Sequence, residues 1–141
     1  MDAFPSFTRV SIDNILADRP GIYNVDYPAS EYAARLEEAR QVFSGEIDAL
    51  LEQKKNVVLD SAFYAKKQRD EYKAMVERAS GRLVLVYLKA EREVLWKRIC
   101  ERRRKEVNAD SAREISSALL DQFVRGFEVP EDEGEIVIRV E

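Results

Sequence analysis

The sequence of 141 residues contains no histidine and a single cysteine. Cys100 alone cannot form an internal disulfide, and without histidine the usual zinc sites and the Ser/His and Cys/His catalytic pairs are excluded. No apolar run approaches the length of a membrane span, and the stretch from Met1 to Pro5 lacks the basic start of a signal peptide. We therefore expect no membrane partner and a cytoplasmic location.

An excess of positive charge is also missing. The chain has 23 basic and 27 acidic residues, for a net charge of −4. This balance supplies no overall attraction for nucleic acid, and basic residues cluster only from Arg102 to Lys105. Nucleic acid is therefore expected only as a substrate that is met locally. The apolar content of 45% and the chain length predict one folded domain over residues 1–141.

What the sequence does contain is an alternation of short apolar runs with helical patterns. Four strands are expected. Two of them end at Asp13 and at Asp60, and the other two span Leu83–Leu88 and Ile136–Val140. The run at Leu83–Leu88 has no polar alternation, which predicts a central strand covered on both faces. Helices are expected between and after them, and the order predicts an α/β fold with a mainly parallel sheet. The expected helices span residues 14–18, 30–53, 66–80, 91–106 and 111–126.

Details of the helix ends are also predicted. Ser30 is expected to cap the first long helix, and Gly45 is expected to kink or break it. Gly81 is expected at the position just after the second long helix. Ser111 and Glu114 have the spacing of a capping box.

Acidic residues at strand ends are the first candidates for a site. Asp60 closes a short buried strand and is followed nine residues later by Arg69, on the next expected helix. In open α/β sheets ligands bind beyond the carboxyl ends of the strands, which favours Asp60 as a site residue. The alternative is that Asp60 only caps backbone N–H groups of a turn.

Several segments in this order resemble the P-loop kinases. The closest resemblance is to the zeta-toxin-like and polynucleotide-kinase-like AAA domain ATP-binding proteins, and a more distant one is to shikimate and gluconate kinases. It covers the chain from about Thr8 onward. The residues that carry it are Ser11-Ile12-Asp13, Val57 to Phe63 with Arg69, Leu83 to Leu88, Arg98-x-x-x-Arg102 and Phe127-Glu128-x-Pro130-x-x-Glu133.

The sequence departs from this family at its defining element. The family has a first strand followed by a Gly-x-x-x-x-Gly-Lys-Ser/Thr loop, whereas none of the five glycines here precedes a lysine. A strand, loop and helix need roughly 30 residues, and only six residues precede Phe7. We therefore expect a three-layer P-loop fold without its first strand and P-loop. Because that strand is central in the family, exposed sheet edges are expected to allow self-association.

The resemblance also implies a role for each candidate residue. Asp13 and Asp60 match the catalytic carboxylates at the ends of two strands, and Arg69 matches a substrate-binding residue. Arg98 and Arg102 match nucleotide-binding arginines, and ATP and Mg²⁺ are the implied cofactors, with no separate protein metal site. The alternatives are a cap at Asp13, a solvated helix residue at Arg69, and a solvated basic face for Arg98 and Arg102.

These matches predict an ATP-dependent kinase-like protein that transfers a phosphoryl group to a hydroxyl. The acceptor would be a small molecule or a nucleic-acid end, and the absent loop predicts an impaired activity. Two alternatives remain, namely a non-catalytic remnant that binds a nucleotide or a partner, and a truncated fragment.

Overall fold

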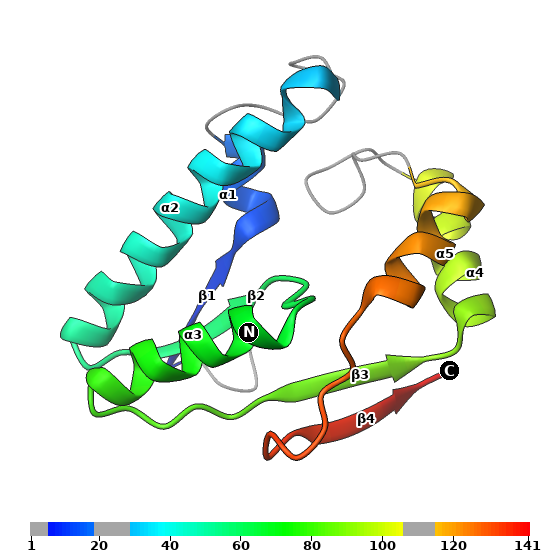
Figure 1. Cartoon of the computed structure of the whole chain (residues 1–141). Helices are drawn as coiled ribbons and strands as arrows, with labels where there is room; N and C mark the ends of the chain where they lie inside the picture. The colour runs from blue at the N-terminus through cyan, green and yellow to red at the C-terminus, as the bar shows by residue number, and fades with distance from the viewer. Residues whose placement is uncertain (1–5, 19–28, 106–114) are drawn as a thin grey trace. The chain divides into compact units, whose positions relative to one another are not determined.

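The computed structural model describes residues 6–18, 29–105 and 115–141 (Figure 1). The chain divides into two compact units. The described part of the first unit is residues 6–18 and 29–62, and that of the second unit is residues 63–105 and 115–141. A single domain over residues 1–141 stays a prediction. Within the described residues, no helix combines the length and the apolar character needed to cross a membrane.

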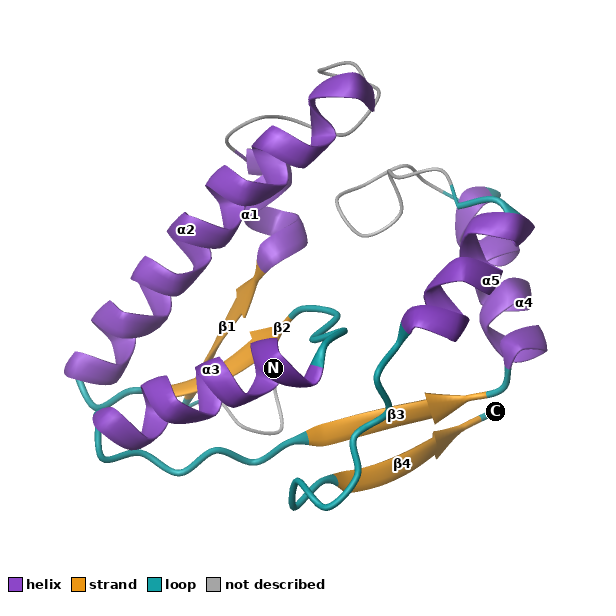
Figure 2. Cartoon of the chain, in the orientation of Figure 1, coloured by secondary structure: helices purple, strands orange, loops and turns teal. Residues whose placement is uncertain are grey.

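The first unit is a pair of parallel strands with helices. The two strands lie side by side in Figure 2, and their register puts Phe7 beside Asn56 and Ser11 beside Asp60. The elements in chain order are β1 (Phe7–Ser11), α1 (Ile12–Asp18), the short 3-10 turn η1 (Ala29–Glu31), α2 (Tyr32–Glu52) and β2 (Asn56–Asp60).

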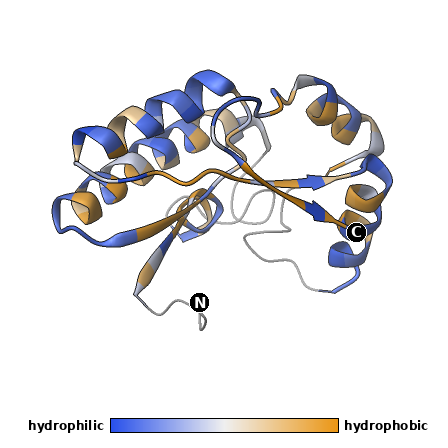
Figure 3. Cartoon of the chain, turned by 90° about the horizontal axis from the view of Figure 1, so that it is seen from below, coloured by the Kyte–Doolittle hydropathy of each residue, from blue (hydrophilic) through white to orange (hydrophobic). Residues whose placement is uncertain are grey.

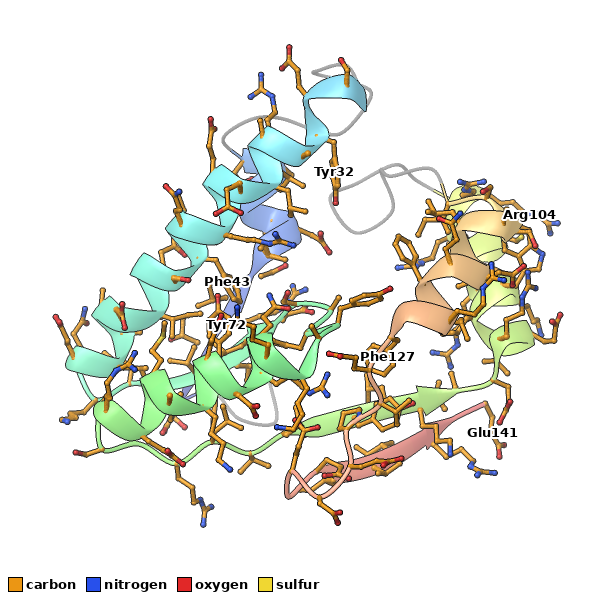
Figure 4. All side chains as sticks on the ribbon, in the orientation of Figure 1. Tyr32, Phe43, Tyr72, Arg104, Phe127 and Glu141 are labelled. Atoms are coloured by element: carbon orange, nitrogen blue, oxygen red, sulfur yellow. The ribbon has the colours of Figure 1, made fainter. Side chains whose placement is uncertain are left out.

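The core of the first unit lies under α2, as the helical spacing of apolar residues predicts. Phe43, which Figure 4 labels on this helix, and Ile47 are almost completely buried, with exposed fractions of 1% and 0%. Helix α2 contacts α1, β1 and β2. The other buried apolar residues of this unit are Val10, Ile12, Ile15, Leu16 and Ala39.

Two helix starts differ from the predictions. The first strand ends at Ser11, so Asp13 lies in the first turn of α1 and not at the strand end. The Ser11 hydroxyl accepts a hydrogen bond from the Asn14 backbone N–H at 3.4 Å, which allows the chain to turn into a helix two residues earlier than expected. The expected cap Ser30 lies in η1, and α2 follows Glu31 without a side-chain cap.

Helix α2 continues through Gly45, so the predicted break is absent, and a kink there stays a prediction. A Cβ atom built at this position would meet nothing within 4 Å. Gly45 lies on the exposed side of a helix whose opposite side packs in the core, and this packing stabilises the helix despite the low helix propensity of glycine.

The second unit contains the other parallel strand pair. The register puts Val86 beside Ile136 and Ala90 beside Val140. Both strand pairs in the described part of the chain are parallel, as predicted, and each forms a two-stranded sheet; a single sheet through all four strands stays a prediction. The elements in chain order are α3 (Lys66–Arg78), β3 (Val86–Ala90), α4 (Arg92–Arg103), α5 (Ser117–Gly126) and β4 (Ile136–Val140).

The end of α3 differs by one residue from the prediction. Ser80, with a φ of 61°, takes the left-handed position expected for Gly81. The Ser80 N–H donates to the Glu77 carbonyl and the Gly81 N–H to the Val76 carbonyl, both at 2.9 Å, which is the hydrogen-bond pattern of a Schellman motif. Gly81 is still needed, because its Cβ would lie 2.9 Å from Val76 Cγ1.

Helix α5 begins later than predicted. It is capped by Ser116, whose hydroxyl accepts from the Leu119 N–H at 3.1 Å. The predicted capping box of Ser111 and Glu114 lies outside the described residues.

Strand β3 is not covered on both faces, so that prediction is wrong. Val86 and Leu88 are 49% and 63% exposed, and Val84, which precedes the strand, is 54% exposed. On the other face Tyr87 packs against Phe127, with ring centroids 5.7 Å apart. An apolar run predicts that a strand is suited to burial, but it does not show which neighbour covers it.

The fold predicts that Gly45→Ala stabilises the protein. The new methyl group meets no neighbour, and alanine in a helix is about 1 kcal/mol more favourable than glycine. Urea unfolding followed by circular dichroism should show that the free energy of unfolding increases by about that amount. The matched variant Gly81→Ala should be destabilised, because the side chain and carbonyl of Val76 must move; equal effects at both sites would contradict this account.

Candidate functional site

The carboxyl ends of β1 and β2 bring the two candidate acids to one end of the first unit. Ser11 is the register partner of Asp60, and Asp13 follows Ser11 by two residues in the first turn of α1. Ser11 is buried, whereas Asp13 and Asp60 are exposed. Asp13 and Asp60 therefore both follow the carboxyl ends of the strand pair, with Asp13 carried by a helix start, and their catalytic roles stay predictions.

Asp60 pairs with Arg9, a residue that the sequence did not single out. Arg9 Nε donates to Asp60 Oδ2 at 3.0 Å, and its Nη2 contacts the same oxygen. The side chains are 42% and 50% exposed, so the pair contributes at most about 1 kcal/mol to stability. The pair also matters for the site, because it places the positive charge of Arg9 next to the Asp60 carboxylate. The alternation of β1, which places Arg9 on the same side as Ser11, was the signal that could have identified it.

Arg69 has a structural partner in the second unit. Arg69 Nε and Nη2 donate to the two carboxylate oxygens of Glu133 at 2.9 and 3.0 Å, and Nη1 donates to the Phe63 carbonyl at 2.8 Å. The side chains of Arg69 and Glu133 are only 5% and 10% exposed. The predicted contact of Arg69 with substrate stays a prediction, and in the structure its guanidinium joins α3 to the loop before β4.

The electrostatics of this pair are those of a partly desolvated ion pair. Hydrogen bonding to Arg69 holds the pKa of Glu133 below its usual value, against the opposing effect of burial. Hydrogen bonding to Glu133 in turn raises the pKa of Arg69. Both shifts favour the charged forms, so the two residues remain an ion pair at neutral pH.

The segment from Phe127 to Glu133 contacts α3 at further points. The Glu128 carboxylate accepts a hydrogen bond from the Lys66 N–H, and the Glu128 N–H donates to the Tyr64 carbonyl at 3.0 Å. Lys66 begins α3, and its N-cap Ala65 has no capping side chain, so Glu128 supplies the missing acceptor. The residues that carried the family resemblance here therefore hold the start of α3 in place.

Arg98 and Arg102 lie one turn apart on α4. Both are exposed, and Arg98 Nη2 donates to the Glu141 carbonyl at 3.0 Å. Figure 4 labels Arg104 at the end of the same helix, where further basic side chains gather. The exposed basic residues of this stretch are Lys97, Arg98, Arg102, Arg103, Arg104 and Lys105.

Helix α4 is attached to α5 by Arg92. Arg92 Nε donates to Asp121 Oδ1 at 2.8 Å, and its Nη2 reaches the hydroxyl and carbonyl oxygens of Ser117. The Arg92 guanidinium also lies 5.7 Å from the centroid of the Trp96 ring. These contacts fix the first turn of α4, while Arg98 and Arg102 lie farther along the helix.

The described residues do not form a Mg²⁺ site by themselves. Kinase sites hold Mg²⁺ through one or two carboxylates together with the phosphates. Oδ2 of Asp60 accepts from Arg9, and the described residues contain no group of three or more acidic, cysteine or histidine side chains placed to hold a metal ion.

The buried ion pair predicts a specific pH dependence. Because the pKa of Glu133 is lowered on folding, its stabilisation is complete above the ordinary value of 4.5 and is lost as the pH falls through the lowered value. Glu133→Gln should cost roughly 3–5 kcal/mol at pH 7, because Arg69 then keeps a buried charge without a counter-ion. Urea unfolding at pH 7 and at successively lower pH should show that the difference in unfolding free energy between Glu133→Gln and the unchanged protein becomes smaller as the pH falls.

The control for this prediction is Asp132→Asn. It removes a negative charge from the same loop at an exposed position, and asparagine tolerates the φ of 53° found there. At pH 7 the free energy of unfolding should be much lower for Glu133→Gln than for Asp132→Asn. Equal stability of both would mean that the ion pair does not hold the loop.

Comparison with known proteins identifies the family. A family model described as "AAA domain" matches residues 1–130, which is most of the chain. No curated protein matches the sequence. The matched range includes the strand-end acids, the arginines of α4 and the segment from Phe127 to Pro130. The chain therefore belongs to the AAA domain family, a P-loop kinase-like family of ATP-binding proteins.

Proposed function

We propose that this chain is a nucleotide-binding, kinase-like protein. In this proposal its ancestral activity is phosphoryl transfer from ATP to a hydroxyl group of a small molecule or of a nucleic-acid end. The transfer is impaired in this chain. The observation that carries the proposal is the position of Asp60 at the carboxyl end of β2, and of Asp13 just beyond the carboxyl end of the neighbouring parallel strand β1, in a member of a P-loop kinase-like family. This is where open α/β sheets bind ligands.

The chemistry of the candidate residues suits phosphoryl transfer. Such catalysis consists mainly of positioning groups and neutralising charge, so it uses carboxylates near the acceptor and arginines near the phosphates. We assign Asp13 to the acceptor hydroxyl, because it is exposed in the first turn of α1, just beyond the carboxyl end of β1. We assign Arg98 and Arg102 to the nucleotide, because guanidinium groups bind phosphate oxygens in pairs.

The proposed impairment follows from two features. The sequence contains no Gly-x-x-x-x-Gly-Lys-Ser/Thr loop, whose backbone N–H groups and lysine surround the phosphates. Arg9 also partly neutralises Asp60, the acid expected near the metal. We propose accordingly that the chain has the three-layer arrangement of the family without its first strand and phosphate loop.

A second function from another class is favoured by the same two features. A non-catalytic protein that binds a nucleotide or a partner needs neither the glycine loop nor a free strand-end carboxylate. In that case Arg9 and Asp60 would serve only to join β1 to β2. The two functions differ in whether the strand-end acids affect phosphate transfer.

The test is calorimetric titration of the chain with Mg-ATP, combined with an assay of phosphate transfer. We expect binding weaker than about 1 mM and no transfer, because arginines alone cannot enclose the phosphates. An extended chain with an added strand, Gly-x-x-x-x-Gly-Lys-Ser/Thr loop and helix before residue 1 should bind ATP tightly. Tight magnesium-dependent binding by the 141 residues alone would contradict the proposed impairment.

Variants of the extended chain separate the residue roles. Arg102→Ala should lower kcat/KM through lost charge stabilisation, and Asp13→Asn should mainly lower kcat. Lys97→Ala, an exposed change on the same helix, is the matched control for Arg102. Unchanged kinetics in both site variants would remove these residues from the site and favour the non-catalytic function.

A further inference from the structure

The carboxyl end of the sheet formed by β3 and β4 carries two basic residues side by side. Lys89 and Arg139 are register partners, each the second-last residue of its strand, and both are exposed. Register partners in a parallel pair point to the same side of the sheet, so the two positive charges are neighbours. Figure 3 shows both strands as hydrophobic over most of their length and hydrophilic near their arrowheads. Like charges in this arrangement are destabilising.

These two cations have no acidic partner in the part of the chain that the structure describes. Glu91 and Glu141 directly follow the two strands, yet neither forms an ion pair with Lys89 or Arg139. Other basic side chains of the second unit do form ion pairs, namely Lys66 with Asp70, Arg69 with Glu133 and Arg92 with Asp121. The repulsion between the two neighbours is therefore not relieved by a counter-ion of the described chain.

A third cation reaches the same end of the sheet from α4. Arg98 Nη2 donates to the carbonyl of Glu141, the residue that follows β4, at 3.0 Å. This bond uses one of the five N–H donors of the guanidinium and holds the group at the carboxyl end of the strands. Three elements thus bring positive charge to one end of a parallel pair, which is where ligands bind in open α/β sheets.

The usual structural reason for basic residues near a helix end does not explain this group. Cations in the last turn of a helix are stabilised by the helix dipole, which accounts for Arg102 and the basic residues after it. Arg98 lies one turn earlier, and its guanidinium bonds to the chain after β4. Lys89 and Arg139 lie on strands, whose net dipole is small. These three cations therefore call for a negative charge from outside the described chain.

We propose that Lys89, Arg98 and Arg139 bind a chain of phosphate groups that carries no magnesium. Ammonium and guanidinium groups both bind phosphate oxygens, and adjacent phosphates carry enough charge to meet three cations at once. The described residues hold no group of three or more acidic, cysteine or histidine side chains placed for a metal ion, so the metal-free anion suits this end of the sheet.

The inference rests on the proposed function in one respect, because Arg98 is assigned there to the nucleotide. It adds Lys89 and Arg139 as further phosphate-binding residues. It requires no phosphoryl transfer and no role for the strand-end acids, so binding of the anion can be measured by itself.

The first experiment is a titration of the whole chain with inorganic tripolyphosphate, without magnesium, followed by amide chemical shifts. The shifts around Lys89, Arg98 and Arg139 should change with a dissociation constant of roughly 1 mM, as expected for a few exposed charge contacts. Lys89→Gln and Arg139→Gln should each raise this constant about threefold, and together about tenfold. Lys73→Gln is the matched control, since Lys73 is exposed on α3, and it should leave the constant unchanged.

A titration with metal-free ATP identifies the source of the phosphate chain. Equal constants for ATP and tripolyphosphate would show that the phosphates alone are recognised. Tighter binding of ATP would show that the nucleoside also makes contact, for example with half-buried Tyr87, which lies two residues before Lys89 on the same face. Both results support the site. Magnesium should weaken the binding of either anion, because it neutralises the phosphates that the three cations attract.

The second experiment measures unfolding by urea without any anion. Lys89→Gln should raise the urea concentration at the midpoint, because it removes one of two neighbouring like charges. The rise should become smaller in high salt, which screens exposed charges from one another. A lower midpoint would mean that Lys89 stabilises the sheet, and that would contradict the proposed role.

Three results of the titration would overturn the proposal. Equal shifts with sulfate at the same ionic strength would mean that the charges are only screened. An equal loss of affinity in Lys73→Gln would mean that only net charge matters. Tighter binding with magnesium would mean that carboxylates hold the ligand. The proposed function fails by a different result, namely unchanged kinetics of Asp13→Asn and Arg102→Ala in the extended chain.

Discussion

The ion pair between Arg69 and Glu133 is the constraint on which the second unit depends. It joins α3 to a loop 64 residues farther along the chain through two parallel hydrogen bonds, and Arg69 also holds the Phe63 carbonyl. Breaking the ion pair would expose a buried charge that has lost its partner. Separating the loop before β4 from α3 therefore has a large free-energy cost. The position of the last strand therefore depends on a contact made by a helix near the middle of the chain.

Much of the fold could be predicted from local patterns. The spacing of Ala39, Phe43 and Ile47 predicted both the existence and the buried side of α2. Apolar residues that recur with a 3.6-residue period over 21 residues indicate a helix with one buried face. The strands at Asn56–Asp60 and Ile136–Val140 were equally clear. Helix boundaries were less accurate, since α1, capped by the Ser11 hydroxyl, starts at Ile12, before the expected strand end at Asp13.

The candidate residues could be named from the sequence, but the partners that they have in the structure could not. Asp60 and Arg69 were singled out by their place at and after a strand end and by the family resemblance, yet their counter-charges, Arg9 and Glu133, lie 51 and 64 residues away in sequence. Contacts of that range depend on how the elements pack, which no local pattern specifies. For the same reason the apolar run around Leu88 predicted a buried strand, whereas its exposure depends on neighbours that the run itself does not encode.

The parallel register of both strand pairs has a consequence for the rate of folding. Phe7 pairs with Asn56 and Val86 with Ile136, so each ladder closes a loop of about 50 residues. Closing such a loop costs roughly 3.5 kcal/mol of chain entropy beyond a constant. The helices form from near neighbours and need no such closure, so they should precede the strands. During synthesis β3 must wait for some 50 further residues before its partner exists, and over that interval its aliphatic side chains have no strand beside them.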